Sequence, residues 1–199
     1  MIERLVLATH NRKKAGEMRE VLLAVDAVGQ IKTLADYPGA PVPEETGATY
    51  SENALIKARS AVEFTGEWCL ADDAGLEIDA LPGDLGVHSK RYGGDSTFEQ
   101  KIRLVLERMQ SVEDSKRTAR FRCCVALVSP QGEHSTFESL CEGRIAREPA
   151  GSGGFGYDPI FFLPELRCTL AQLTPEQKHA VSHRGKVLRE LAKVLPSLS

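Results

Sequence analysis

The sequence predicts an α/β fold with a mixed β-sheet, in which residues 1–199 form a single domain with two lobes. Segments with strand-like and helix-like apolar patterns alternate along the chain. Two consecutive strand patterns flank Pro130-Gln131-Gly132, which is typical of a hairpin. No internal repeat or linker-like stretch divides the 199 residues, and this length suits one large domain.

Helices are expected where apolar residues recur at intervals of three and four, because that spacing places them on one helix face. Thr97 with Gln100 three residues later fits a capping box, and Thr174 followed by Pro175 is a strong helix start. The predicted helices are residues 13–25, 51–65 and 97–109, a helix that begins at 174–177, and residues 186–195.

Strands are expected in short apolar or alternating runs. Asp72-Asp73 is expected to end one strand, and the alternation in Gly75–Leu81 indicates a separate strand after it. The predicted strands are residues 5–8, 31–34, 68–72, 75–81, 119–128 and 135–143. Proline and glycine residues predict loops at 36–46, 82–94 and 147–159.

Composition and charge narrow the class of protein. With 25 Lys and Arg against 28 Asp and Glu, the net charge is −3, which argues against a nucleic-acid partner. No apolar run approaches the roughly 18 residues that a membrane helix needs, and the N-terminus shows no secretory signal. Five cysteines without a Cys-x-x-Cys motif indicate reduced thiols in a cytoplasmic protein, with no zinc and no disulfide.

A basic segment, Thr9-His10-Asn11-Arg12-Lys13-Lys14, lies between the first expected strand and the first expected helix. A strand-to-helix turn directs backbone N–H groups and the positive end of the helix towards a ligand. Thr9 and Asn11 add short polar groups and Lys14 adds a charge, which together suit a phosphate chain. The alternative is a capped helix with a solvated basic first turn.

Two pairs of adjacent carboxylates are candidates for a metal site. Glu44-Glu45 ends a loop and Asp72-Asp73 ends an expected strand. Adjacent carboxylates in a cleft require a cation or a shared proton, and Mg²⁺ prefers one or two carboxylates together with waters and substrate phosphates. The pattern therefore favours Mg²⁺ near these carboxylates, and acidic turns in water are the alternative.

Two segments of the C-terminal half could contact a planar ring. Residues 151–159 contain Gly-x-Gly-x-x-Gly, but no helix opens after it, so a dinucleotide site is not predicted. The loop lets the backbone approach a ligand, with Phe155 and Tyr157 available for stacking. Ser182-His183-Arg184-Gly185 is expected to form a break between two helices. The hydrogen-bond donors of this segment could reach a base carbonyl or a phosphate. A structural turn and an exposed polar junction are the alternatives.

Taken together, these segments resemble the inosine/xanthosine triphosphate pyrophosphatases, which act on noncanonical purine nucleotides. The resemblance extends from residue 5 to residue 195 in the family's order. The segments that carry it are Thr9-x-Asn11-x-x-Lys14, Glu45-Thr46-Gly47, Glu52-Asn53-Ala54, Lys57-Ala58, Asp72-Asp73-x-Gly75-Leu76, Arg147-Glu148-Pro149, Gly154-Phe155-Gly156-Tyr157-Asp158-Pro159 and Ser182-His183-Arg184-Gly185.

The resemblance implies both a fold and an activity. The implied fold is an elongated, twisted mixed sheet flanked by helices, with a cleft between two lobes, usually in a homodimer. The implied activity is Mg²⁺-dependent hydrolysis of dITP, ITP, XTP and dXTP to the monophosphate and pyrophosphate. We expect attack at the α-phosphorus, so that deaminated purines are removed from the nucleotide pool.

The resemblance also implies roles for residues. Asp73 would accept a proton in catalysis, and Asp73 and Glu45 would bind Mg²⁺, with Glu44 as the alternative to Glu45. The residues that would contact the nucleotide are Thr9, His10, Asn11, Arg12, Lys13, Lys14, Lys57, Ala74, Phe155, Gly156, Tyr157, Asp158, Lys178, His183 and Arg184. Many members have Ser or Thr in place of Ala74 and Gly in place of His10, so a hydroxyl contact is lost and a narrower phosphate loop is expected.

Selectivity has an expected cause. Inosine and xanthosine carry a carbonyl at C6 where adenine carries an amino group, so a fixed donor leaves adenine mismatched. We expect that donor on or beside His183 or Arg184. The alternatives are a pyrophosphatase for pyrimidine triphosphates, a nucleotide-binding regulatory module without turnover, and a nucleic-acid binder. A carboxylate such as Asp73 argues against the regulatory module, because pure binding needs no group that activates water.

Overall fold

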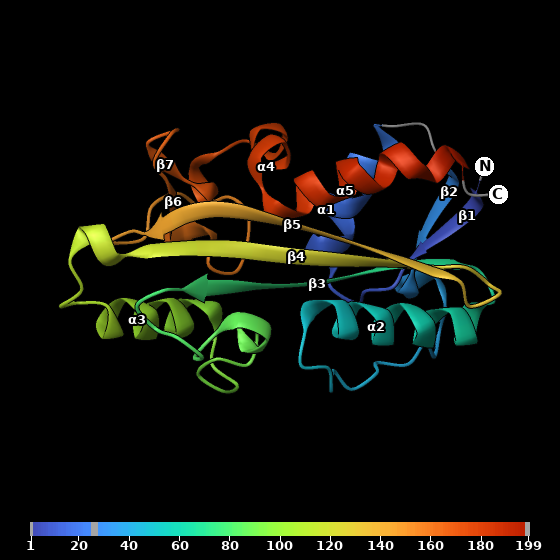
Figure 1. Ribbon diagram of the computed structural model, residues 1–199, viewed down its shortest axis with the longest axis horizontal. Coiled ribbons are helices and arrows are strands. Elements are labelled where there is room, and N and C mark those ends of the chain that lie inside the picture. Colours follow the sequence, from blue (N-terminus) through green and yellow to red (C-terminus); the bar gives the residue numbers. More distant parts are fainter. Residues whose placement is uncertain (1, 25–27, 198–199) are drawn as a thin grey trace. The chain divides into compact units, whose positions relative to one another are not determined.

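The structure, a computed structural model that describes residues 2–24 and 28–197, contains a mixed β-sheet (Figure 1). Within the described residues the strand order is β2-β1-β3-β4-β5-β6-β7. The strands are β1 (Ile2–Leu7), β2 (Val28–Thr33), β3 (Trp68–Ile78), β4 (Thr118–Val128), β5 (His134–Ile145), β6 (Phe161–Leu163) and β7 (Cys168–Thr169). β1 pairs in parallel with β2 and β3, whereas β6 pairs antiparallel with β5 and β7. The predicted mixed sheet is confirmed.

The helices begin within one residue of their predicted starts, except the last, which begins three residues earlier than predicted, at His183. The capping boxes are present at Thr97 with Gln100 and at Thr174 with Gln177. The helices are α1 (Arg12–Leu23), α2 (Tyr50–Thr65), α3 (Phe98–Arg108), α4 (Pro175–Val181) and α5 (His183–Val194). The end of the first predicted helix, at residue 25, lies outside the described residues.

β3 differs most from its prediction. The sequence predicts two strands that meet near Asp72-Asp73, but the structure has one continuous strand with both aspartates inside it. Their carboxylates pair with lysine and arginine side chains, and such pairing removes the main penalty for charges inside a buried strand. The predicted break at 182–185 is also narrower, because Ser182 alone separates α4 from α5 and His183 begins α5.

The chain divides into two compact units. The first unit comprises Met1–Asp73, Cys123–Ser139 and His183–Ser199, and the second comprises Ala74–Arg122 and Leu140–Ser182. Strands β3, β4 and β5 contribute residues to both units.

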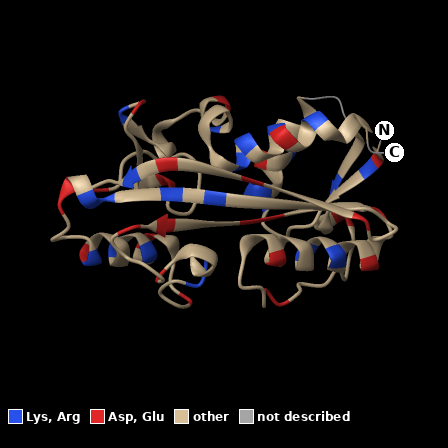
Figure 2. Cartoon of the chain, viewed as in Figure 1, with Lys and Arg blue, Asp and Glu red and all other residues tan. Residues whose placement is uncertain are grey.

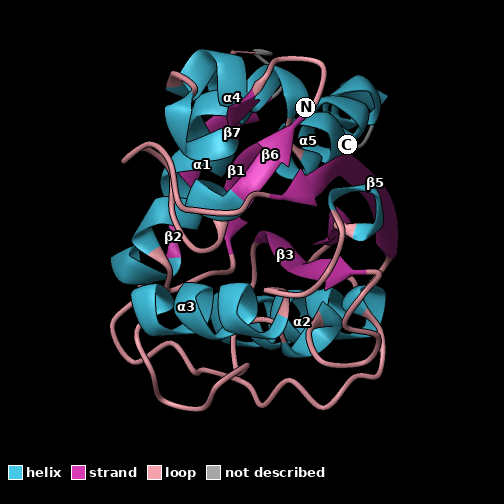
Figure 3. Cartoon of the chain, turned by 90° about the vertical axis from the view of Figure 1, so that its left-hand side faces the viewer, coloured by secondary structure: helices cyan, strands magenta, loops and turns pink. Residues whose placement is uncertain are grey.

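In the first unit, helices cover both faces of the sheet. α1 packs against α5 on one side, and α2 lies on the other side (Figures 1 and 3). The inner face of α2 is made of small residues, Ala54, Ala58 and Ala61, which pack in a core cluster with Val6 and Ala71. These short side chains bring α2 close to β3, so polar residues on the same face of α2 can reach the aspartates.

In the second unit, α3 packs its apolar face, which includes Ile102 and Val105, into a core cluster with Phe161. Figure 2 shows basic positions along β4 beside acidic positions on β3. Arg120 pairs with Asp79 at 2.9 Å, and partly exposed pairs of this kind add little to stability. Across the described residues of both units, no helix has the length and apolar character needed to cross a membrane.

Candidate active site

The basic segment at the start of α1 is a capped helix terminus. Asn11 is the N-cap, and its Oδ1 accepts from the backbone N–H groups of Lys13 at 3.0 Å and Lys14 at 3.1 Å. Thr9 Oγ1 accepts from the backbone N–H of Asn11 at 3.2 Å. The cap therefore occupies backbone donors that the sequence offers to a phosphate, and the cationic side chains of Arg12, Lys13 and Lys14 carry the positive charge here.

The buried Asp72 holds two cations in the first unit. Its Oδ2 lies 3.1 Å from Lys14 Nζ, 3.1 Å from Arg184 Nε and 2.8 Å from Arg184 Nη2. Burial raises the pKa of Asp72, but the charges of Lys14, Arg184 and Lys57 outweigh it and hold that pKa well below its usual range. Asp72 is therefore ionised and serves as an anchor for Lys14 and Arg184.

Glu17 extends this network. Its Oε2 accepts from Arg184 Nη1 at 2.7 Å, so Arg184 lies between two carboxylates. Glu17 is three residues after Lys14 in α1, on the same helix face. The motifs do not single out Glu17. Its spacing from Lys14 is the feature of the sequence that could have identified it.

Lys57 joins the two carboxylates predicted to bind a metal. Its Nζ lies 2.8 Å from Asp73 Oδ1 and 3.3 Å from Glu45 Oε1. Glu45 is half-buried whereas Glu44 is exposed, so the geometry favours Glu45 as the functional member of that pair.

The electrostatics distinguish Asp73 from Asp72. Burial raises the pKa of Asp73, and the opposing charge of Lys57 does not fully offset that rise. For Lys57, burial lowers the pKa, but the attraction of Asp73, Asp72 and Glu45 outweighs it and the pKa is raised. A clustered carboxylate with a raised pKa, paired with a protonated lysine, is a candidate general base.

Glu45 and Asp73 are the candidate ligands for a metal ion. Residues 2–24 and 28–197 hold no group of three or more His, Cys, Asp or Glu that could bind a metal ion by itself. Glu45 and Asp73 contact the same ammonium, so both carboxylates lie at one place. Mg²⁺ takes one or two carboxylates and completes its shell with waters and substrate phosphates. The pair therefore fits a metal that arrives with a phosphorylated substrate.

The second unit contains a separate cluster in the Gly-rich loop. Asp158 Oδ2 accepts from Lys178 Nζ at 2.6 Å and from the backbone N–H of Phe155 at 2.7 Å. The ammonium of Lys178 lies 4.7 Å from the centre of the Phe155 ring. Gly154 has a φ of +66°, and a Cβ there would lie 2.1 Å from Asp158 Oδ2. Only glycine fits, so the loop is shaped around the buried Asp158.

The aromatic residues of this loop differ in their surroundings. Tyr157 is 3% exposed, its hydroxyl donates to the carbonyl of Ser89 at 2.9 Å, and its ring meets Phe98 edge-on. Tyr157 is thus packed in the core of the second unit. Phe155 is half-buried and is the ring better placed to stack on a ligand.

The remaining predicted residues are more dispersed. His10 is exposed, and its Nε2 lies 3.3 Å from the carbonyl oxygen of Pro41 in the loop that leads to Glu45. His183 is buried in the first turn of α5. Ala74 and Gly156 are half-buried in the second unit.

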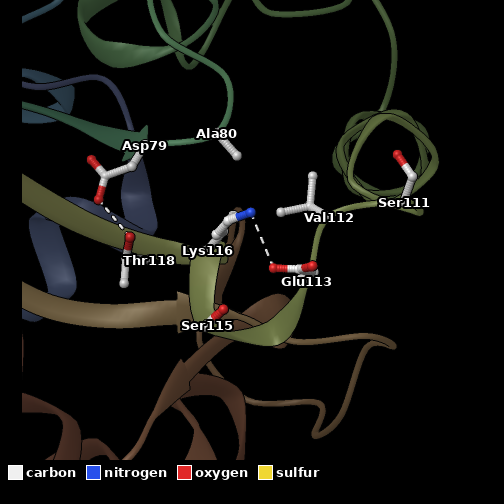
Figure 4. A pocket seen from close by; sticks show the side chains of 8 residues that line it. All are labelled: Asp79, Ala80, Ser111, Val112, Glu113, Ser115, Lys116 and Thr118. Carbon is white, nitrogen blue, oxygen red and sulfur yellow. Dashed lines mark hydrogen bonds and ion pairs between the residues drawn. The ribbon is translucent and has the colours of Figure 1, made fainter.

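A hollow of about 630 Å³ also lies in the second unit (Figure 4). Two pairs form among its polar groups: Lys116 with Glu113 at 3.1 Å, and the Thr118 hydroxyl with Asp79 at 2.6 Å. None of its lining residues belongs to the predicted site. They are Asp79, Ala80, Ser111, Val112, Glu113, Ser115, Lys116 and Thr118.

Comparison with known proteins shows similarity over nearly the whole chain. The chain is 45% identical over 199 residues to a dITP/XTP pyrophosphatase of Desulforamulus reducens, with 98% of this chain and 96% of the relative covered. A dITP/XTP pyrophosphatase of Halalkalibacterium halodurans is 47% identical over 191 residues, with 96% and 97% covered.

Solved structures give the same result. The structure of a HAM1 protein from Coxiella burnetii matches with a TM-score of 0.87 and 42% identity, over 98% of this chain and all of the other. The Staphylococcus aureus Ham1 protein matches with a TM-score of 0.86 and 32% identity, over 99% of this chain and 100% of the other. The Ham1 family model matches residues 5–194. The resemblance drawn from the sequence motifs is confirmed, and the chain belongs to the Ham1 family.

Proposed function

We propose that this chain hydrolyses dITP, ITP, XTP and dXTP to the nucleoside monophosphate and pyrophosphate, and so removes deaminated purines from the nucleotide pool. The observation that carries the proposal is the contact of one ammonium, on Lys57, with both Glu45 and Asp73. The names of relatives that are 45% and 47% identical support the same activity.

The proposed roles follow from charge and burial. Glu45 and Asp73 would hold Mg²⁺, which supplies a Lewis acid for the phosphate oxygens and lowers the pKa of a bound water. Asp73 accepts a proton from the attacking water, because burial raises its pKa towards that of a working base. Lys57 and Lys14 offset the negative charge of the phosphate oxygens, and Asp72 keeps Lys14 in place.

The base would be bound by other groups. Phe155 would stack on the purine, and Asp158 keeps the Phe155 backbone and Lys178 in fixed positions. His183, buried at the start of α5, is proposed to donate to the C6 carbonyl or to align the backbone that does. A buried donor that adenine leaves unpaired can reject it by a factor of about 10⁴–10⁵.

The assay that tests this function is hydrolysis of dITP, XTP, ATP, GTP and dTTP, with and without Mg²⁺, with separate detection of pyrophosphate and single phosphate. We expect pyrophosphate from dITP and XTP only in the presence of Mg²⁺. Release of single phosphate would contradict attack at the α-phosphorus. Turnover of dTTP in preference to dITP would favour a pyrimidine enzyme, and tight binding without product would favour a regulatory module.

We also propose that the protein acts as a homodimer in the cytoplasm. Its cysteines 69, 123, 124, 141 and 168 are free thiols, in agreement with a reducing compartment. Size-exclusion chromatography with light scattering tests the assembly, and a mass near that of one chain, 21.8 kDa, would contradict the dimer.

A further inference from the structure

Asn53 is a fully buried polar side chain in contact with the predicted metal site. It lies on α2 and has 0% exposure, and a buried amide needs hydrogen-bond partners. Its Oδ1 accepts from the backbone N–H of Gly47 at 2.8 Å. Its Nδ2 donates to Asp73 Oδ2 at 3.5 Å, the outer limit for such a bond. One side chain therefore links the loop before α2 to the middle of β3.

Asn53 and Lys57 contact different oxygens of the Asp73 carboxylate. The two residues are one turn apart on α2, and Lys57 contacts Oδ1 whereas Asn53 contacts Oδ2. The Asn53 amide is neutral, so it orients Oδ2 without placing a second positive charge beside it. A second ammonium at this position would compete with a divalent cation.

The other end of the link fixes the loop that carries Glu45. Gly47 is two residues after Glu45, and a Cβ on Gly47 would lie 2.7 Å from Asn53 Oδ1 and 2.6 Å from the Cβ of Glu52. Only glycine allows the loop to approach α2 this closely. A second anchor lies next to it, because Glu52 Oε2 accepts from the backbone N–H of Ala48 at 2.7 Å.

We infer that Asn53 is a positioning residue that sets the placement of Glu45 relative to Asp73 and thereby the affinity of the pair for a divalent cation. This inference rests on the proposed function of these two carboxylates. Mg²⁺ demands near-ideal geometry at about 2.0–2.1 Å from its ligands, so a small displacement of one carboxylate weakens binding. Loss of a partner that orients a metal ligand typically weakens metal affinity about 10–100-fold.

The test is Asn53→Ala, with Mn²⁺ alone as the probe and electron paramagnetic resonance as the measure of binding. We expect Mn²⁺ to bind about 10–100-fold more weakly than to the wild-type chain. The Mg²⁺ concentration for half-maximal ITP hydrolysis should rise by a similar factor. The KM for ITP at saturating Mg²⁺ should change little, because the contacts of Asn53, with Gly47 and Asp73, include no group assigned to the nucleotide.

Two further variants make the test specific. Gly47→Ala keeps Asn53 but displaces the loop from the other side, so it should weaken Mn²⁺ binding in the same direction. Glu52→Ala is the matched control, because it removes only the bonds that the Glu52 carboxylate accepts from the backbone N–H groups of Ala48 and Thr49, which follow Gly47. It leaves the link from Gly47 through Asn53 to Asp73 intact. It should lower the melting temperature and leave Mn²⁺ affinity unchanged.

Wild-type Mn²⁺ affinity and an unchanged Mg²⁺ requirement in Asn53→Ala would overturn the inference, whatever the melting temperature. If Asn53→Ala does not fold, the Mn²⁺ affinities of Gly47→Ala and Glu52→Ala are compared instead. Wild-type Mn²⁺ affinity in Gly47→Ala would then overturn the inference. The failure of the proposed function gives a different result: no ITP hydrolysis by the wild-type chain. Weaker Mn²⁺ binding in Asn53→Ala would then still support the positioning role.

Discussion

Apart from the buried pair of Lys178 with Asp158 in the second unit, the two units of the chain hold their buried cations in different ways. In the first unit, cations and carboxylates form a shared network in which Asp72 contacts both Lys14 and Arg184. In the second unit, Lys101 is 4% exposed and donates to the main-chain carbonyls of Lys90, Tyr92 and Gly94 at 2.8, 2.8 and 2.7 Å. Carbonyl oxygens neither titrate nor leave their place, whereas carboxylates can exchange a lysine for a metal.

This difference separates charges that fix the fold from charges that can do chemistry. Arg117 in the second unit follows the pattern of Lys101, because its guanidinium donates to the carbonyls of Met109, Ile145 and Ala146. The contacts of Lys57 with Glu45 and Asp73 are of the other kind. Buried and half-buried lysines thus serve two purposes in one chain, and the oxygens that each lysine contacts, carbonyl or carboxylate, indicate its purpose.

The largest change in stability is expected for Asp72→Asn. The substitution removes the charge that holds Lys14 and Arg184, and breaking a buried ion pair typically costs about 3–5 kcal/mol. Urea denaturation measures the free energy of unfolding. Glu17→Gln is the matched variant and should have a smaller effect, because Arg184 keeps Asp72. An equal loss in the free energy of unfolding in both variants would contradict the role of Asp72 as the main anchor of Lys14 and Arg184.

The neighbouring substitution, Asp73→Asn, should instead act on activity. Loss of a preorganised electrostatic group typically costs a factor of about 10²–10³ in rate, and we expect at least that fall in kcat for ITP. Stability should not fall in the same way, because the raised pKa of Asp73 means that its ionised form is disfavoured in the fold. Near-wild-type turnover would remove Asp73 from its catalytic role.

Lys101→Met tests the second unit. The variant leaves three partly buried carbonyls without their donor, and an unsatisfied buried polar group costs about 1–3 kcal/mol. We expect a loss of stability in that range, seen by urea denaturation. Arg103→Met, an exposed position on the same helix, is the control and should leave stability unchanged. An equal change in both variants would show that the carbonyl contacts of Lys101 add nothing.

The smallest effect concerns pH. The pKa of Asp72 is lower in the folded chain than its unfolded value of about 3.9. Its stabilisation is therefore fully present above that unfolded value and is lost as the pH falls through the folded value. The stability difference between the wild-type chain and Asp72→Asn should stay constant from pH 8 to pH 5 and shrink in stronger acid. A difference that shrinks between pH 8 and pH 6 would contradict this assignment.

Local signals predict much of the fold. Periodicity and capping boxes place the helices, because these features depend on residues three or four positions apart. They fail at β3, because the partner that stabilises Asp72 inside the strand is Arg184, 112 positions later. Short strands such as β7, with two residues, carry too little pattern to be predicted.

The sequence likewise predicts some features of the candidate site and not others. The motifs identify Lys57 and Asp73, whose side chains meet across 16 positions. They do not assign a role to Asn53, because its importance lies in contacts with Gly47 and Asp73 that no spacing encodes. The sequence also leads us to expect free backbone N–H groups at the start of α1. In the structure those of Lys13 and Lys14 donate to Asn11 Oδ1, which belongs to the same motif.

The most direct test of the proposed roles, with Lys57 acting on the phosphates and Lys178 acting on the base, is the ratio of kcat/KM for ITP to that for ATP. This ratio is measured in the wild-type chain, Lys57→Met and Lys178→Met. Lys57→Met should lower both values by about 10²–10³ and leave their ratio unchanged, because it acts on groups common to all triphosphates. Lys178→Met should lower the ratio, because Lys178 supports the ring that would bind the base. A changed ratio in Lys57→Met with an unchanged ratio in Lys178→Met would contradict the account.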